Sequence, residues 1–236
     1  MIHRCPKCGA SFRPPRDDES ECPQCGIWFH KWGAALPEPA AAAVLEAEES
    51  EPLPPPDSLT YYGRAAVLLL VAVWGVFLAA ADYRNPPQSF DFMHAILLPI
   101  HEAGHVFMFP FGEFLTIAGG SLFQVALPLG IGAAFLFKQH DRFGAAVCLW
   151  WAGASVVDLA PYIYDALQPQ LILLGGHTGE DGPHDWIYLL DRFHSLQRAH
   201  GWGIAAHHLG VLTMIVAIGW GGAWLWRLAP WRREEA

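Results

Sequence analysis

The segment His101-Glu-Ala-Gly-His105 combines residue types that can bind a metal ion and activate a water molecule. On a helix, side chains four residues apart lie on one face, so the imidazoles of His101 and His105 could hold one zinc ion. Glu102 lies beside them, where a carboxylate can take a proton from a zinc-bound water. The segment lies in an almost uncharged apolar run, and ionisable clusters are costly inside a membrane. The pattern therefore favours a catalytic site, with a buried structural cluster as the alternative.

The composition is typical of a membrane protein. Of 236 residues, 53% are hydrophobic and 16% are charged, whereas soluble domains carry about 25% charged residues. Several apolar stretches approach the roughly 20 residues that cross a bilayer. The formal net charge of −9 comes largely from an acidic segment near residues 38–57, which is expected to be a solvated linker. No basic stripe indicates nucleic-acid binding.

Four of the five cysteines form two CxxC pairs, Cys5/Cys8 and Cys22/Cys25. Two such knuckles supply four thiolates for one structural zinc ion, and this spacing predicts a zinc ribbon. Zinc thiolates require a reducing compartment, so we expect the ribbon to be cytoplasmic; two disulfides are the alternative. Cys148 lies in an apolar stretch and is expected to be a core side chain.

The expected fold class is an all-α polytopic membrane protein with a small N-terminal zinc-ribbon β module. The predicted parts are the ribbon at residues 1–33, a Pro-, Ala- and Glu-rich linker at 34–60, a membrane domain at 61–228 and a charged tail at 229–236. Short strands are expected at residues 10–12 and 27–30 of the ribbon. We expect the ribbon to serve folding or the docking of a cytoplasmic protein, not nucleic-acid binding.

Five apolar stretches are predicted to span the membrane, at residues 65–81, 90–111, 121–137, 144–166 and 202–228. Pro99 is expected to kink or restart the second stretch. Residues 112–120 are glycine-bearing and partly β-prone, which predicts a hairpin or re-entrant segment. A cytoplasmic ribbon and a basic cytoplasmic C-terminus require an even number of crossings. Either one stretch is therefore re-entrant or the C-terminus lies outside.

A catalytic zinc ion usually has three protein ligands, so two histidines are not sufficient. Asp158 and Asp165 share one helix face if the helix persists through Pro161. One of them could complete the metal site, while the other orients a histidine. The glycine-rich stretch 175–186 offers the rival candidates His184 and Asp185, either in a solvated loop or in a lid over the site.

In these motifs the chain resembles the site-2 protease family of intramembrane zinc metalloproteases. That family places HExxH on one membrane helix and an aspartate on a later one, in a pattern of Asn, two residues, Pro and then Asp-Gly. Asp165 matches the ligand aspartate and Asp158 takes the place of the Asn, while Ala166 replaces the Gly and the gap after Pro161 is shorter. Within the resemblance, which covers residues 92–166, the segment Gly119-Gly-Ser121 with Gln124 and Pro128 is similar to the family's glycine-rich region.

The resemblance implies peptide-bond hydrolysis inside the membrane, with a catalytic zinc ion held by His101, His105 and Asp165 and with Glu102 as general base. The implied partners are a membrane-protein substrate and the lipid bilayer, in the cell membrane of a bacterium. The alternative is a metal-stabilised membrane adaptor without catalysis, whose ribbon docks a cytoplasmic partner. A weaker resemblance links His200, His207 and His208 to the histidine boxes of membrane di-iron hydroxylases, although HxxHH is absent.

Overall fold

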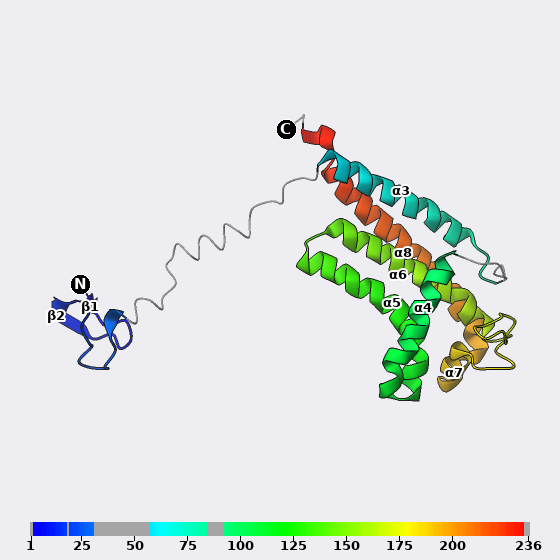
Figure 1. Ribbon diagram of the computed structural model, residues 1–236, viewed down its shortest axis with the longest axis horizontal. Coiled ribbons are helices and arrows are strands. Elements are labelled where there is room, and N and C mark those ends of the chain that lie inside the picture. Colours follow the sequence, from blue (N-terminus) through cyan, green and yellow to red (C-terminus); the bar gives the residue numbers. More distant parts are fainter. Residues whose placement is uncertain (1, 18, 31–56, 85–91, 234–236) are drawn as a thin grey trace. The chain divides into compact units, whose positions relative to one another are not determined.

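The computed structural model describes residues 2–17, 19–30, 57–84 and 92–233, and the chain divides into two units at residues 1–55 and 56–236 (Figure 1). Most of the predicted linker, residues 34–56, lies outside the described residues. The segment Asn85-Pro86-Pro87, predicted to break the chain after the first span, also lies outside them.

The N-terminal unit contains two antiparallel strands, β1 (Ile2–Arg4) and β2 (Ser11–Arg16). The strand expected at residues 10–12 therefore forms the start of β2. The strand expected at residues 27–30 is reduced to one bridge between Glu21 and Trp28. The buried core is small and consists of Cys5, Phe12, Cys22 and Phe29. So small a core supplies little folding energy, and modules of this kind depend on a bound metal ion.

The second unit is helical (Figure 1). Its helices are α3 (Ser58–Ala80), α4 (Phe92–Met108), α5 (Glu113–Lys138), α6 (Arg142–Asp165), α7 (Asp185–Arg192) and α8 (Ala199–Arg227). Three 3-10 turns complete the unit: η1 (Phe109–Phe111), η2 (Leu196–Arg198) and η3 (Pro230–Arg233).

Four helical stretches are long and apolar enough to cross a membrane: α3, α5, α6 and Leu196–Arg227, which contains α8. They are consistent with an integral membrane protein. The five predicted crossings are not confirmed, because α4, the helix of the histidine motif, has only 17 residues. At about 1.5 Å per residue such a helix is roughly 26 Å long, which is short for a hydrocarbon core of about 30 Å.

The prediction of a hairpin at residues 112–120 is wrong, because Glu113 to Gly120 form the first turns of α5, whereas the alternative of a re-entrant segment stays a prediction. The glycines there serve close helix packing. A Cβ atom at Gly119 would lie 2.6 Å from the carbonyl oxygen of Gly104 on α4, so only small residues allow the two backbones to approach. Pro99 does not end α4, and α6 likewise continues through Pro161.

Helix α6 forms the centre of the unit. In its most apolar window 67% of the residues are buried, against 17–28% in the other three candidate spans. It packs closely along α8, where a Cβ at Gly210 would lie 2.6 Å from the carbonyl oxygen of Gly153. Helix α3 covers this pair, and Val71, Trp150 and Met214 belong to the shared core.

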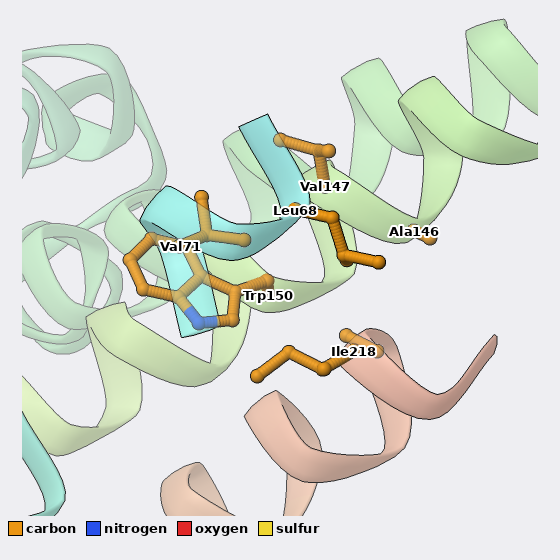
Figure 2. A pocket seen from close by; sticks show the side chains of 7 residues that line it. Leu68, Val71, Ala146, Val147, Trp150 and Ile218 are labelled. Atoms are coloured by element: carbon orange, nitrogen blue, oxygen red, sulfur yellow. The ribbon is translucent and has the colours of Figure 1, made fainter. Parts of the chain in front are cut away.

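A small apolar pocket lies where α3, α6 and α8 meet (Figure 2). It is lined by Leu68, Val71, Ala146, Val147, Trp150, Ala217 and Ile218. The only polar atom among these side chains is the indole nitrogen of Trp150. The pocket therefore has no group that could bind a metal ion or transfer a proton.

Candidate metal centres

The four ribbon thiols of Cys5, Cys8, Cys22 and Cys25 could hold a metal ion, since their sulfur atoms all lie within 4.8 Å of one another. The Sγ atoms of Cys5 and Cys25 are 3.7 Å apart, and those of Cys8 and Cys22 are 3.8 Å apart. Tetrahedral zinc with Zn–S bonds of about 2.3 Å places its sulfurs about 3.8 Å apart. All five cysteines, including the buried Cys148, are free thiols, so the disulfide alternative is not found.

The two knuckles have the same backbone geometry. Gly9 and Gly26 follow the second cysteine of each pair with φ angles of +76° and +72°, a region that glycine adopts without strain. Their N–H groups donate to the carbonyl oxygens of Cys5 and Cys22, at 3.0 and 2.9 Å. Burial raises the pKa of the Cys5 thiol, but hydrogen bonds, including one from the backbone of Cys8, outweigh it and lower that pKa to about 6. At Cys5 this favours the thiolate that binds metal, whereas burial and hydrogen bonds to the neighbouring thiols raise the pKa of Cys25 to about 12.

A second group that could hold a metal ion consists of His101, His105 and Asp185. The Oδ2 atom of Asp185 lies 3.0 Å from Nε2 of His101 and 3.2 Å from Nε2 of His105. The two histidines are one turn apart on α4, as their spacing predicts, and Asp185 is the first residue of α7. The third member of the group therefore comes from the end of the glycine-rich stretch.

Helix α5 orients both imidazoles. Nδ1 of His105 donates to the backbone carbonyl of Thr116 at 2.8 Å, and Nδ1 of His101 lies 2.9 Å from Oε1 of Gln124. When Nδ1 carries the proton, Nε2 keeps its lone pair. Both lone pairs then point at the carboxylate of Asp185. In this tautomer three electron-rich atoms converge with no hydrogen between them, an arrangement that a cation stabilises.

Gly120 leaves room for such a cation. A Cβ atom there would lie 2.6 Å from Nε2 of His105 and closer still to Nε2 of His101. Thr116, Gly120 and Gln124 are four residues apart on α5 and therefore share one face. That face contains two acceptors for the imidazole protons and, between them, the residue with no side chain.

A hydrogen bond from its backbone N–H group holds Asp185 in place. Its N–H donates to the hydroxyl oxygen of Tyr162 on α6 at 2.9 Å. In the metal-free site the Nε2 atoms of His101 and His105 can instead carry protons and donate to this carboxylate. Burial raises the pKa of the Asp185 carboxyl, but these hydrogen bonds outweigh it and lower the pKa to about 2. The carboxylate is therefore ionised at neutral pH, as a metal ligand must be.

Asp165, the predicted third ligand, lies outside this group. Its Oδ1 accepts the N–H groups of Gln170 and Leu171 at 2.8 and 3.0 Å, and its Oδ2 lies 3.5 Å from Nε2 of His184. His184 in turn caps α7, because its Nδ1 accepts the N–H of Ile187. Both residues thus stabilise the loop that ends at Asp185.

The other predicted residues fall into two classes. Glu102 is half-buried next to His101, near enough to His105 and Tyr162 for its charge to act on both. Asp158 contacts Gln124 and His94 and is not a member of the metal group. The remaining candidates, His200, His207 and His208, lie on α8 and are likewise not members of a described metal group.

The sequence alone predicts no role for Thr116, and it singles out Gly120 and Gln124 only through the resemblance of a glycine-rich region. The available signal was their four-residue spacing, which matches that of His101 and His105. The spacing becomes informative only once the segment is known to be helical and to pack against α4.

No family model matches the chain, and no curated protein or solved structure is significantly similar to it. The site-2 protease family therefore stays a resemblance of motifs. The centre on α4 is interpreted from its own geometry.

Proposed function

We propose that the chain is an integral-membrane zinc peptidase whose zinc ion is held by His101, His105 and Asp185. The observation that carries this proposal is the convergence of Nε2 of His101, Nε2 of His105 and a carboxylate oxygen of Asp185. Two histidines and a carboxylate form one of the donor sets of hydrolytic zinc, which keeps a further position open for water. Gly120 supports the proposal because it leaves the face of α5 open at this point.

Zinc bound there would supply a Lewis acid and lower the pKa of a bound water to about 7. Glu102 would take a proton from that water as its oxygen attacks the scissile carbonyl carbon. The carboxyl of Glu102 would then return the proton to the amide nitrogen as the C–N bond breaks. His101, His105 and Asp185 keep their positions throughout, since Thr116, Gln124 and Tyr162 hold them by hydrogen bonds.

The proposed substrate is a membrane-embedded peptide segment. Helix α4 packs against two candidate spans, α5 and α6, so its motif belongs to the apolar part of the chain. A substrate helix in lipid has its backbone groups hydrogen-bonded internally and must unwind locally before a carbonyl is attacked. This matches the resemblance to site-2 proteases, except that the third ligand is proposed to be Asp185 instead of Asp165.

The ribbon is proposed to hold a second, structural zinc ion on Cys5, Cys8, Cys22 and Cys25. Thiolate ligation suits a reducing compartment, so the ribbon is proposed to be cytoplasmic, in a bacterial cell membrane. There it would be available to a cytoplasmic protein partner.

The decisive variant is Glu102→Gln, with His105→Ala as the matched variant that loses a ligand. The purified full chain is incubated with a library of apolar peptides, products are identified by mass spectrometry, and zinc is counted in each sample. We expect Glu102→Gln to keep its zinc and lose cleavage by at least about 100-fold, whereas His105→Ala loses one zinc and cleavage together. Full cleavage by Glu102→Gln would refute the mechanism. A wild-type chain that binds both zinc ions yet cleaves nothing would favour the adaptor.

A further inference from the structure

A chain of hydrogen bonds connects the metal ligand His101 to helices α5 and α6. Nδ1 of His101 lies 2.9 Å from Oε1 of Gln124, and Nε2 of Gln124 donates to Oδ2 of Asp158 at 2.9 Å. Oδ1 of Asp158 lies 3.0 Å from Nδ1 of His94, which precedes His101 by about two turns of α4. Gln124 is only 1% exposed, so water cannot readily replace either of its partners.

The direction of these hydrogen bonds is fixed because the carboxylate of Asp158, which lies between Gln124 and His94, can only accept hydrogen bonds. The amide of Gln124 must therefore present its NH₂ group to Asp158 and its carbonyl oxygen to His101. A flipped amide would place two oxygens against each other in a buried site, which is costly. With the carbonyl oxygen of Gln124 facing it, Nδ1 of His101 must be the donor, and the lone pair of Nε2 points away from Gln124.

We propose that Asp158, acting through Gln124, is a positioning residue that fixes the tautomer of His101 and so presents Nε2 to the metal ion. The proposal rests on the proposed metal centre but not on peptidase activity. Asp158 is not a member of the group that could hold the metal ion. Its carboxylate determines the amide orientation of Gln124, and the amide determines which nitrogen of His101 is protonated.

A carboxylate is needed at residue 158 because an amide could present either its oxygen or its NH₂ group. In Asp158→Asn only the weaker contact of Nε2 of Gln124 with the carbonyl oxygen of Ser155, at 3.5 Å, opposes a turn of the Gln124 amide. Once the amide turns, His101 can take the tautomer that protonates Nε2. We expect this variant to weaken zinc binding at the α4 centre by about 10- to 100-fold, the usual effect of losing such a partner.

The test uses the purified full chain, in which the ribbon zinc is an internal standard. Zinc is withdrawn by a graded chelator, and the affinity of the α4 centre is compared with that of the ribbon. The double variant Gln124→Glu/Asp158→Asn restores the direction of the hydrogen bonds between residue 158, residue 124 and His101, with almost no change in side-chain shape. The carboxylate introduced at residue 124 must accept from His101, and the amide introduced at residue 158 can donate to that carboxylate. We expect this variant to recover most of the lost affinity.

Ser155→Ala is the matched control, since it removes a fully buried hydroxyl of α6 that donates to the carbonyl of Trp151. It leaves in place the backbone carbonyl of Ser155, which accepts from Gln124. It should leave zinc affinity unchanged, which separates the positioning role from a general effect on folding. Wild-type affinity in Asp158→Asn, or a double variant no better than Asp158→Asn, would overturn the proposal. A wild-type chain that binds only the ribbon zinc would instead refute the proposed function itself.

Discussion

At Gly120 a single methyl group should decide whether the α4 centre can form. A Cβ there would lie 2.6 Å from Nε2 of His105, a distance that forces the imidazole to move. Hydrogen bonds from Nδ1 to α5 hold both histidines, so neither can move without losing its orientation. We expect Gly120→Ala to lower the zinc content by about one ion per chain, measured by elemental analysis, although alanine is the better helix former by about 1 kcal/mol.

Gly130→Ala is the control for this prediction, because it lies on the same helix and has nothing within 4 Å of its Cβ position. It should keep both zinc ions. If Gly120→Ala also kept both, the Nε2 atoms of His101 and His105 could not be the ligands.

At this scale the sequence predicts the motif but not its surroundings. The spacing of His101 and His105 predicts a shared helix face, and the structure confirms it. The choice between Asp165 and Asp185 depends on how a loop of 19 residues between α6 and α7 returns to the bundle, which local patterns do not encode. The resemblance favoured Asp165, whereas the geometry brings Asp185 to the histidines.

The contact between α4 and α5 depends on two glycines. A Cβ at Gly119 would lie 2.6 Å from the carbonyl oxygen of Gly104 and 2.7 Å from Cβ of Met108. We expect Gly119→Ala to push the helices apart and lower the free energy of unfolding by about 1–3 kcal/mol. Ordinarily Gly→Ala in a helix stabilises it by about 0.5–1 kcal/mol, so the sign is opposite. Thermal unfolding in detergent measures the change.

Gly219→Ala on α8 provides the comparison, because nothing lies within 4 Å of its Cβ position. It should be neutral or stabilising in the same melt. A Gly119→Ala chain as stable as Gly219→Ala would show that the two helices do not need this close approach.

The four candidate spans were predictable as elements because each contains an apolar window of 18 residues, which local composition reveals. The first turns of α5 were not predictable from local composition. Taken alone, the glycines and β-branched residues of 112–120 favour a turn or strand. They become favourable helix residues only where the backbone of α4 lies against them, and that contact is a tertiary one.

In the described residues of the helical unit, contacts between helix ends define two opposite ends of the bundle. At one end the start of α3, the α5–α6 junction and the end of α8 meet. There Arg64 lies 3.4 Å from Asp141 and its guanidinium lies 5.1 Å from the centre of the Trp224 ring. At the other end, His207 of α8 donates to the carbonyl of Ala79 at 3.2 Å. If α3, α5, α6 and α8 each cross the membrane once, the start of α3 and the end of α8 lie on the same side. Four crossings therefore remove the conflict that five crossings create for a cytoplasmic ribbon and a cytoplasmic C-terminus.

Basic residues indicate which face is cytoplasmic. By sequence, six flank the first end (Arg64, Lys138, Arg142, Arg227, Arg232 and Arg233) and three flank the second (Arg84, Arg192 and Arg198). The excess of Lys and Arg predicts that the first end is cytoplasmic. Tyr162, whose hydroxyl holds Asp185, lies near the last turn of α6, at the second end. The loop that supplies the proposed third ligand should therefore face away from the cytoplasm.

Cysteine labelling tests this orientation in a chain whose five native cysteines are replaced. Gln139 and Glu180 are exposed residues at opposite ends of α6. In intact cells a membrane-impermeant maleimide should label Glu180→Cys and not Gln139→Cys, and inside-out vesicles should reverse the pattern. Labelling of both residues from one side would contradict an odd number of crossings between them. Because α3 begins at the same end of the helical unit as Gln139, this result would also place the start of α3 on the cytoplasmic side of the membrane, opposite the loop of Glu180.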